Sequence, residues 1–341
     1  WTGFARLEYV VPEVLVTRRS GCFSATVAVK VDADSSTDDV LSRIEHILSE
    51  MRFPTGSIGQ HLDAELKSRT DLPDFAGWSS NIGRSLEMIG KGNIEKVVMA
   101  RRTDLSLAEK IDPVELLAAL KSANRNCFGF MFEPARGSAF TGITPERLFR
   151  IDHDKIESEA VSGTASFDDS IPGSGVAGTE LLSSDKNMRE HGFVLSYVAE
   201  KLGELCDDVA EPSERTLLNL SNVSHIYSKL SGRLSAGLSV GDVVSCLHPT
   251  PAVCGISSEN ALRLIGELEP FHRGWYAGTV GVIGHDYSEM AVAIRSALVS
   301  DDKVSLFAGS GIVDGSTPTQ EWQELEYKIA PALRILGGVL V

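Results

Sequence analysis

The stretch 128-FGFMFEPARGSAFTGITPERLFRIDHDKIESEA-160 predicts a run of short strands separated by turn residues. We expect the strands at Phe128–Phe132, Ala139–Thr141, Leu148–Ile151 and Ile156–Ala160. The chain lacks the glycine-rich phosphate turns of nucleotide-binding folds. We therefore expect an α+β fold, in which a large single domain of antiparallel β-sheets is packed with outer helices.

Strand and helix patterns continue on both sides of this stretch. Further strands are expected at Ser24–Asp32, Ile94–Leu107, Tyr276–Ile283, Met290–Leu298 and Val304–Ala308. Helices are expected at Asp38–Met51, Pro113–Ser122 and Asp185–Leu205, the last with Asp185 as its N-cap. A final helix is expected to begin at Thr317 as N-cap, with Pro318 in the first turn and Gln320 as capping-box partner. The Gly- and Ser-rich stretch Asp168–Gly178 is predicted to be a loop.

Length and composition describe an ordinary globular protein. The 341 residues are enough for two average domains, but we expect one catalytic domain over residues 1–341. The sequence begins at Trp1 in place of methionine, which leaves room for a truncated N-terminal part or a removed transit peptide. The net charge of −15 argues against a nucleic-acid partner, and no apolar run has membrane-spanning length. The five cysteines form no CxxC pair, so we expect a cytoplasmic protein, or a plastid protein if a transit peptide was removed.

Two helices carry acidic residues that could bind a metal. Glu190 is in register with Val194 and Val198, and a carboxylate on an apolar stripe is costly unless it is paired or metal-bound. Alternatively, Glu190 complements the helix dipole. Glu324 and Lys328 lie at i, i+4 spacing, which is more often an exposed ion pair contributing about 0.3–0.5 kcal/mol. Carboxylates on two separate helices would suit Mg²⁺ if the helices meet.

Other candidates lie on strands and turns. Lys96 alternates with Val98 and Ala100, so it either extends to solvent or is held partly buried, where it can act as a base. Glu146 follows a tight turn, as a solvated acid or as a proton donor held in a cleft.

A glycine-containing segment and a nearby arginine could bind a carboxylate. Gly309-Ser310-Gly311 follows a strand and is expected to form a turn, whose backbone N–H groups could cradle a carboxylate. Arg295 could supply a bidentate contact, although an arginine on a strand surface is the commoner case.

The order of several short motifs resembles that of the chorismate-utilising enzymes. These comprise isochorismate synthases, salicylate synthases and the large subunits of anthranilate and aminodeoxychorismate synthases. The matching stretches are Lys96–Arg101 (KVVMAR), Gly142–Glu146 (GITPE), Ser162–Thr164 (SGT), Lys186–His191 (KNMREH), His248–Gly255 (HPTPAVCG), Glu269–Gly274 (EPFHRG), Ala293–Arg295 (AIR), Phe307–Ile312 (FAGSGI) and Glu321–Lys328 (EWQELEYK). Each motif is a weak signal alone, but their shared order is strong evidence.

The resemblance implies a role for each matching residue. Lys96 would be the general base that activates water to attack C2 of chorismate, and Glu146 the general acid that protonates the departing C4 hydroxyl. Glu190 and Glu324 would hold Mg²⁺, with Glu321 acting on the metal through waters. The expected substrate-binding residues are Thr164, His225, Tyr276, Arg295, Gly309 and Lys328.

Two motifs favour one product over the others. Aminodeoxychorismate synthases carry a nucleophilic lysine where this chain has Ser162, and most water-using relatives carry alanine there. HPTPAVCG and Ile294 are similar to isochorismate synthases, whereas Tyr276 is similar to salicylate synthases. We therefore expect an Mg²⁺-dependent isochorismate synthase that serves quinone or siderophore and salicylate supply. Salicylate synthase is the alternative, and an ammonia-using or a non-catalytic relative is less favoured. The expected state is a monomer or weak homo-oligomer without a glutaminase subunit.

Overall fold

The computed structural model describes residues 1–19, 21–52, 62, 64–124, 126–166, 181–220 and 223–338. The predicted loop Asp168–Gly178 lies outside these residues. The chain divides into two compact units, one formed by Trp1 with Gly59–Val341 and the other by Thr2–Ile58. The expectation of one catalytic domain over residues 1–341 stays a prediction.

The first sheet of the large unit is entirely antiparallel. Its strand order is β12-β4-β16-β15-β6-β5, with β3 pairing to the other part of β4. The strands are β3 (Leu66–Leu72), β4 (Lys96–Leu107), β5 (Phe128–Ala135), β6 (Ser138–Thr144), β12 (Gly255–Ile256), β15 (Ser296–Ser300) and β16 (Lys303–Ile312).

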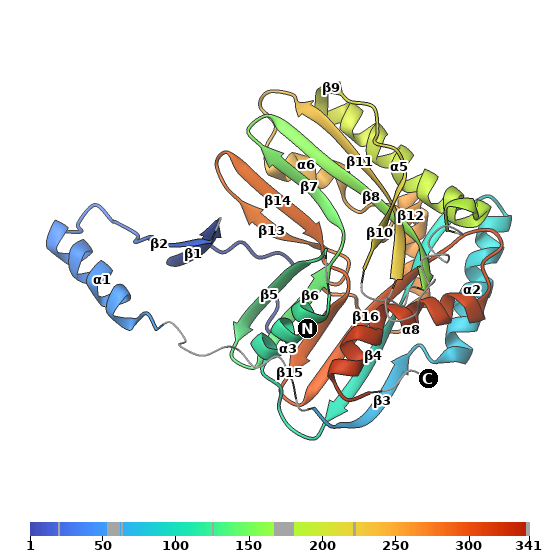
Figure 1. The fold of residues 1–341 in the computed structure, drawn as a ribbon, viewed down its shortest axis with the longest axis horizontal. Helices are drawn as coiled ribbons and strands as arrows, with labels where there is room; N and C mark the ends of the chain where they lie inside the picture. Colours follow the sequence, from blue (N-terminus) through green and yellow to red (C-terminus); the bar gives the residue numbers. More distant parts are fainter. Residues whose placement is uncertain are drawn as a thin grey trace. The chain divides into compact units, whose positions relative to one another are not determined.

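The second sheet is also antiparallel and lies above the first in Figure 1. Its order is β10-β11-β8-β7-β14-β13, and the short β9 also pairs with β11. The strands are β7 (Arg147–Asp152), β8 (Lys155–Ser166), β9 (Cys206–Val209), β10 (Thr216–Asn219), β11 (Val223–Leu234), β13 (Thr279–Ile283) and β14 (Tyr287–Val292).

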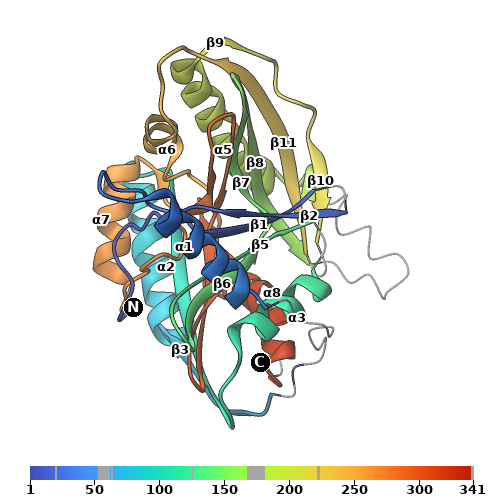
Figure 2. The same cartoon turned by 90° about the vertical axis from the view of Figure 1, so that its left-hand side faces the viewer.

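Helices cover both sheets and create two apolar cores. Beside the first sheet lie α2 (Phe75–Gly90), α3 (Pro113–Ala123), α7 (Ser258–Leu268) and α8 (Pro318–Ile335). Their core includes Trp78, Leu116, Leu264 and Leu325. The long α5 (Asp185–Leu205) lies along β8 and β11, as Figure 2 shows, and contacts the shorter α6 (Val240–Leu247). The second core buries Val194 and Val198 of α5, because apolar residues repeat at helical spacing. The predicted α+β fold of antiparallel sheets with outer helices is confirmed.

The chain crosses between the two sheets at two points that define the site. Only Pro145 and Glu146 separate β6 in the first sheet from β7 in the second. Residues 293–295 likewise separate β14 from β15. The crossings are hydrogen-bonded to each other, since Val292 N donates to Glu146 O at 3.0 Å and Ile143 N donates to Arg295 O at 3.2 Å. Backbone bonds therefore fix Glu146 and Arg295 relative to one another.

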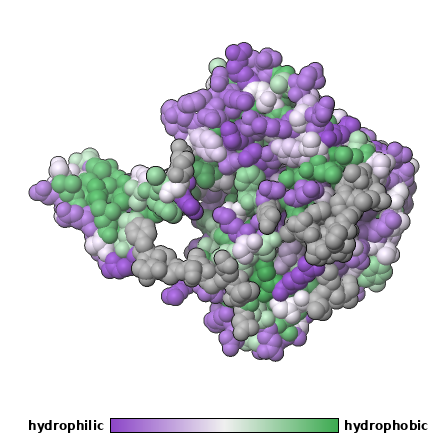
Figure 3. All heavy atoms as spheres, viewed as in Figure 1, coloured by the Kyte–Doolittle hydropathy of each residue, from purple (hydrophilic) through white to green (hydrophobic). Residues whose placement is uncertain are grey.

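The small unit contains the hairpin of β1 (Val14–Arg19) and β2 (Cys22–Val27) and the helix α1 (Thr37–Glu50). Ser36 caps α1 with a complete capping box, although no residue of the helix is buried. Figure 3 shows the apolar side chains of this unit at its surface, including the exposed Leu41 and Leu48.

Several predicted elements need correction. Met290–Leu298 is two strands in different sheets, because Arg295 takes a φ of 51° and interrupts the extended chain. Tyr276 and Ala277 precede β13, and residues 28–32 lie outside β2. The N-cap of α5 is Ser184, which accepts from Asn187 N, and Asp185 lies in the first turn. Thr317 caps α8 as predicted, but its hydroxyl contacts the Gln320 side chain, so the full capping box is not formed.

No helix in the described part of the chain is both long and apolar enough to span a membrane.

Candidate active site

A cleft of about 620 Å³ lies where the two sheets meet. The first sheet contributes Val98, Ala308, Gly309 and Gly311, and the second contributes Ser162, Gly163, Thr164 and His225. The predicted site residues that line this cleft are Glu146, Thr164, Glu190, His225, Tyr276, Arg295, Gly309, Glu324 and Lys328. The structure thus brings together nine of the eleven predicted residues, although their roles stay predictions. Lys96 and Glu321 are buried next to the cleft.

Lys96 is fully buried at the start of β4 and pairs with Glu190 of α5. Its Nζ lies 2.9 Å from Glu190 Oε1. A charge buried in this way is costly unless it is paired, so the ion pair explains how β4 accommodates a lysine. Gly311 makes room for the pair: a Cβ there would overlap Glu190 Oε1 and lie 2.9 Å from Lys96 Cε.

Gly309-Ser310-Gly311 is not a turn, contrary to our expectation. The segment lies within β16, where Gly309 is opposite Ala100 and Gly311 opposite Val98. The N–H of Ala100 donates to Glu269 at 2.7 Å and so points away from β16. In an antiparallel ladder the facing residue then also points outward, so the Gly309 peptide faces the open edge of β16. The predicted carboxylate contact through Gly309 is compatible with this orientation.

Glu269 and Arg273 form a brace behind β4 to which our sequence interpretation assigned no role. Arg273 Nη2 donates to Val98 O at 2.7 Å, and its Nη1 donates to Val253 O at 2.9 Å. Glu269 pairs with Arg273 as well as with Ala100 N. The two side chains therefore satisfy the edge of β4 where no strand pairs with it, and they join it to the HPTPAVCG segment. The EPFHRG motif, which contains both residues, was the feature of the sequence that could have indicated their role.

Glu146 is held in the crossing from β6 to β7 as a buried acid. Burial raises its pKa to about 7, against the opposing effects of the Lys96 and Lys328 charges. Since only 4% of the residue is exposed, the solvated turn that we considered is excluded. A carboxyl group with this pKa is substantially protonated near neutral pH and can donate a proton.

Arg295 is oriented by a neutral histidine. His225 Nδ1 lies 2.9 Å from Gly163 O, so this nitrogen carries the proton. The other ring nitrogen, Nε2, is then the acceptor for Arg295 Nη2 at 3.1 Å. Burial, and to a smaller extent the Arg295 charge, lower the pKa of His225 to about 3. Among the ion pairs of the described residues none involves Arg295, so its positive charge is not cancelled by a carboxylate.

Glu324 and Lys328 form the i, i+4 ion pair that their spacing suggested, but it is not exposed. Lys328 Nζ lies 2.6 Å from Glu324 Oε1 and donates to Gly309 O at 2.8 Å. Burial is the largest single effect and raises the pKa of Glu324, but the charge and hydrogen bond of Lys328, together with the Lys186 charge, outweigh it and hold the pKa of this carboxyl below its usual range. Thr164 adds a hydrogen bond of 3.2 Å to the same carboxylate. The pair therefore belongs to the cleft wall.

Glu321 lies behind the cleft and connects α8 to α5. Lys186 Nζ donates to its Oε1 at 2.6 Å, and Ser310 Oγ donates to its Oε2 at 2.5 Å. The residue is 1% exposed. Both carboxylate oxygens of Glu321 are therefore engaged by protein side chains.

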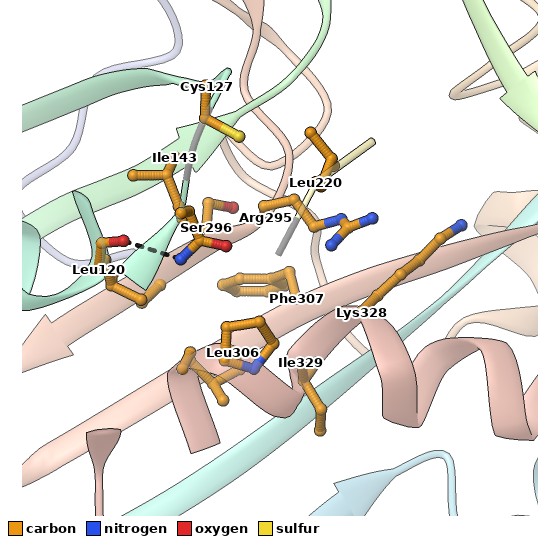
Figure 4. Close-up of a pocket in the computed structure, with 14 residues that line it drawn as sticks. Leu120, Cys127, Ile143, Leu220, Arg295, Ser296, Leu306, Phe307, Lys328 and Ile329 are labelled. Atoms are coloured by element: carbon orange, nitrogen blue, oxygen red, sulfur yellow. Dashed lines mark hydrogen bonds between the residues drawn. The ribbon is translucent and has the colours of Figure 1, made fainter. Parts of the chain in front are cut away.

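Tyr276 closes one side of the cleft by stacking on Phe307, with ring centroids 5.3 Å apart. Its hydroxyl would lie 2.8 Å from a Cβ at position 309, so Gly309 allows the ring to approach β16. A second, more apolar cavity of about 470 Å³ lies on the other side of Arg295 and Lys328, next to α3. Figure 4 shows the cationic ends of these two side chains on the same side of Phe307.

The donor set fits a magnesium ion held by two carboxylates. Within the described ranges no group of three or more His, Cys, Asp and Glu side chains is arranged as a metal site. Mg²⁺ commonly takes one or two protein carboxylates and completes its shell with water and substrate oxygens. Glu190 and Glu324, which face the same cleft from different helices, meet this requirement.

Residues 1–337 match the family described as "Chorismate binding enzyme". The chain belongs to this chorismate-binding enzyme family. It is 33% identical over 342 residues to the chloroplastic isochorismate synthase of Catharanthus roseus, covering 98% of this chain and 59% of that protein. It is 32% identical over 333 residues to isochorismate synthase MenF of Haemophilus influenzae, covering 97% of this chain and 75% of that protein.

Solved structures of chorismate-binding enzymes share the fold. MenF, the menaquinone-specific isochorismate synthase from Escherichia coli, superposes with a TM-score of 0.84 at 30% identity, covering 95% of this chain and 74% of that chain. Anthranilate synthase component I from Streptococcus pneumoniae gives a TM-score of 0.75 at 20% identity, over 91% of this chain and 69% of that one, which shows the fold alone. The chain thus spans about three-fifths of the plant relative and about three-quarters of the bacterial relatives.

Proposed function

We propose that this chorismate-binding enzyme is an isochorismate synthase that requires Mg²⁺. The observation that carries the proposal is that a buried carboxyl group with a pKa raised to about 7, Glu146, lines the same cleft as Glu190, which pairs with Lys96. Water addition at C2 of chorismate with loss of the C4 hydroxyl needs a group that takes a proton and a group that gives one.

The charges of the cleft suit a substrate with two carboxylates. The Lys96 and Lys328 charges are offset by Glu190 and Glu324, whereas the Arg295 charge remains available because its partner His225 is neutral. Arg295, Lys328 and the Gly309 N–H would hold the enolpyruvyl carboxylate. Mg²⁺ held by Glu190 and Glu324 would supply charge neutralisation and orientation for the ring carboxylate.

In the proposed reaction, this chain's side chains move two protons. Lys96 acts in its uncharged amine form and takes a proton from the attacking water as the water oxygen bonds to C2, the ring double bond shifts, and the C4–O bond breaks. Glu146 gives its proton to the departing hydroxyl, which leaves as water. The solved MenF structure is described as menaquinone-specific, so use of the product as a quinone precursor is the first possibility to test.

A second candidate, salicylate synthase, is favoured by Tyr276, whose hydroxyl stands beside Gly309 in the cleft. The deciding experiment incubates the purified protein with chorismate and Mg²⁺ and quantifies isochorismate, salicylate and pyruvate. Isochorismate alone is expected, and pyruvate released together with salicylate would favour the second candidate. Formation of anthranilate with ammonium salts would contradict both.

A further inference from the structure

The buried His191 has no part in the proton transfers described above, although it lies beside the cleft. It follows Glu190 on α5 and is fully buried. Its Nδ1 lies 3.4 Å from Ser162 Oγ, and its Nε2 lies 3.1 Å from Ser228 Oγ on β11. Both ring nitrogens thus face serine hydroxyls, and one of these serines lines the cleft.

Ser162 lines the cleft beside an irregularity in β8. Ser162 faces Ile226 and Thr164 faces His225, so the pairing with β11 shifts by one residue at Gly163, which has a φ of 70°. Such a bulge re-aims the side chains next to it. Ser162 and Thr164 both line the cleft, and Ser162 also contacts His191.

Ser162 belongs to the side of the cleft where Lys96 lies. Its partner His191 is adjacent in sequence to Glu190, and Glu190 holds Lys96 Nζ at 2.9 Å. Residue Gly163, next to Ser162, also approaches α5, since a Cβ there would lie 3.3 Å from Asn187 Cβ. The Ser162 hydroxyl and the Lys96–Glu190 pair are therefore held by the same stretch of α5.

An uncharged imidazole has one donor and one acceptor nitrogen. With Ser228 on one nitrogen, the other fixes the orientation of the Ser162 hydroxyl. Ser162 either gives its proton to the ring and turns lone pairs to the cleft, or accepts from the ring and turns its proton to the cleft. In both arrangements the hydroxyl is oriented before substrate arrives, which lowers the entropic cost of a contact to a reacting group.

We propose that Ser162 is a further catalytic residue, which hydrogen-bonds the attacking water beside Lys96, and that His191 is its positioning residue. The proposal rests on the proposed function, since it assigns a contact to the nucleophile of that reaction. Ser162 forms no bond to the substrate, and the proton of the water still passes to Lys96.

The test compares Ser162→Ala, Ser162→Thr and His191→Asn with the wild-type protein at saturating Mg²⁺. Loss of one hydrogen bond to the nucleophile is expected to lower kcat roughly three- to tenfold. The Kd for chorismate under non-turnover conditions is expected to change less than twofold. Ser162→Thr keeps the hydroxyl and is expected to retain kcat. A double variant that combines Ser162→Ala with His191→Asn is expected to have the same kcat as Ser162→Ala, because His191 acts through Ser162.

Ser158→Ala is the matched control, because Ser158 is a buried serine on the same strand whose hydroxyl donates to Leu148 O at 2.7 Å. It is expected to lower Tm without changing kcat. Wild-type kcat in Ser162→Ala, a loss confined to the Kd for chorismate, or additive losses in the double variant would overturn the proposal. If His191→Asn does not fold, the contrast between Ser162→Ala and Ser162→Thr still decides. A wild-type protein that makes no isochorismate would instead refute the proposed function.

Discussion

Lys96 Nζ donates a 2.9 Å hydrogen bond to Glu190 Oε1 from a position that no solvent reaches. The base of the proposed reaction and a ligand of the proposed metal site are therefore direct neighbours, held by β4 and α5. A change at either residue is expected to affect the other, and the predictions below use this coupling.

Lys96→Ala is expected to lower kcat for isochorismate formation by roughly 10²- to 10⁴-fold, because the general base is lost. The measurement is steady-state turnover of chorismate at saturating Mg²⁺. Lys91→Ala is the matched control, since Lys91 also pairs with a glutamate, Glu87, but on the surface. Retained turnover in Lys96→Ala would refute the role of Lys96.

Glu146→Gln is expected to lower kcat to a similar extent while leaving chorismate binding largely intact, because glutamine keeps the shape of the side chain but cannot give a proton. As burial raises the pKa of Glu146 to about 7, wild-type kcat should fall as the pH rises through that value. The pH profile of kcat tests this, and the residual activity of the variant should lack this decline. A wild-type profile that is flat between pH 6 and 8.5 would contradict the assignment.

The raised pKa of Glu146 also makes the stability of the folded protein depend on pH. The folded protein keeps the proton up to about pH 7, whereas an ordinary glutamate loses it near 4.5. Between these values the folded state binds more protons, so the free energy of unfolding falls as the pH rises, by roughly 3 kcal/mol for this group. Glu146→Gln should therefore be more stable than wild type at pH 8.5 and closer to it at pH 5. Urea unfolding at both pH values measures the difference, and Glu133→Gln, at an exposed position, is the control.

Gly311→Ala is expected to disrupt the site from the strand side, because its Cβ would overlap Glu190 Oε1 and press on Lys96 Cε. We expect at least a hundredfold loss of turnover, since displacement of catalytic groups by about an ångström has effects of this size. Gly83→Ala, which meets open space on the mid-helix surface of α2, should leave turnover unchanged and add roughly 0.5–1 kcal/mol of stability. Equal turnover of the two variants would mean that the close contact at Gly311 is unimportant.

Removal of Mg²⁺ with a chelator is expected to abolish turnover, and added Mg²⁺ should restore it. Glu190→Gln and Glu324→Gln should each weaken Mg²⁺ binding at least tenfold, because each removes a charged ligand. Titration calorimetry with Mg²⁺ in the absence of chorismate measures the affinity independently of turnover. Glu200→Gln, at an exposed position on α5, should bind Mg²⁺ normally. Wild-type affinity in both cleft variants would place the metal elsewhere.

Local patterns predicted the helices well and the interrupted strands poorly. The range of α5, Asp185–Leu205, was predicted from its apolar spacing and from Asp185 as N-cap, and the range is confirmed although the N-cap is Ser184. Met290–Leu298 was predicted as one strand because its residues alternate, and no local signal marks the positive φ of Arg295. That conformation is maintained by bonds from the distant Ile143 and His225, which the local sequence does not encode.

The sequence predicted which residues belong to the site, but not their burial or their contacts. Glycines 309 and 311 suggested a turn, whereas both lie within the continuous strand β16. Glycine is needed there because a Cβ would collide with Tyr276 at position 309 and with Glu190 at position 311. Spacing favoured an exposed pair for Glu324 and Lys328, yet the facing strand makes it part of a cleft. Burial of Glu146 likewise depends on packing between sheets. Nonlocal contacts of this kind are visible only in the folded chain.

The two crossings between the sheets also limit how substrate can reach the cleft. Strands β6–β7 and β14–β15 run almost without a break from one wall to the other, and backbone hydrogen bonds join them. Walls connected in this way cannot swing apart like the jaws of a hinged enzyme. We therefore expect ligands to be exchanged without a change in the relative position of these two walls.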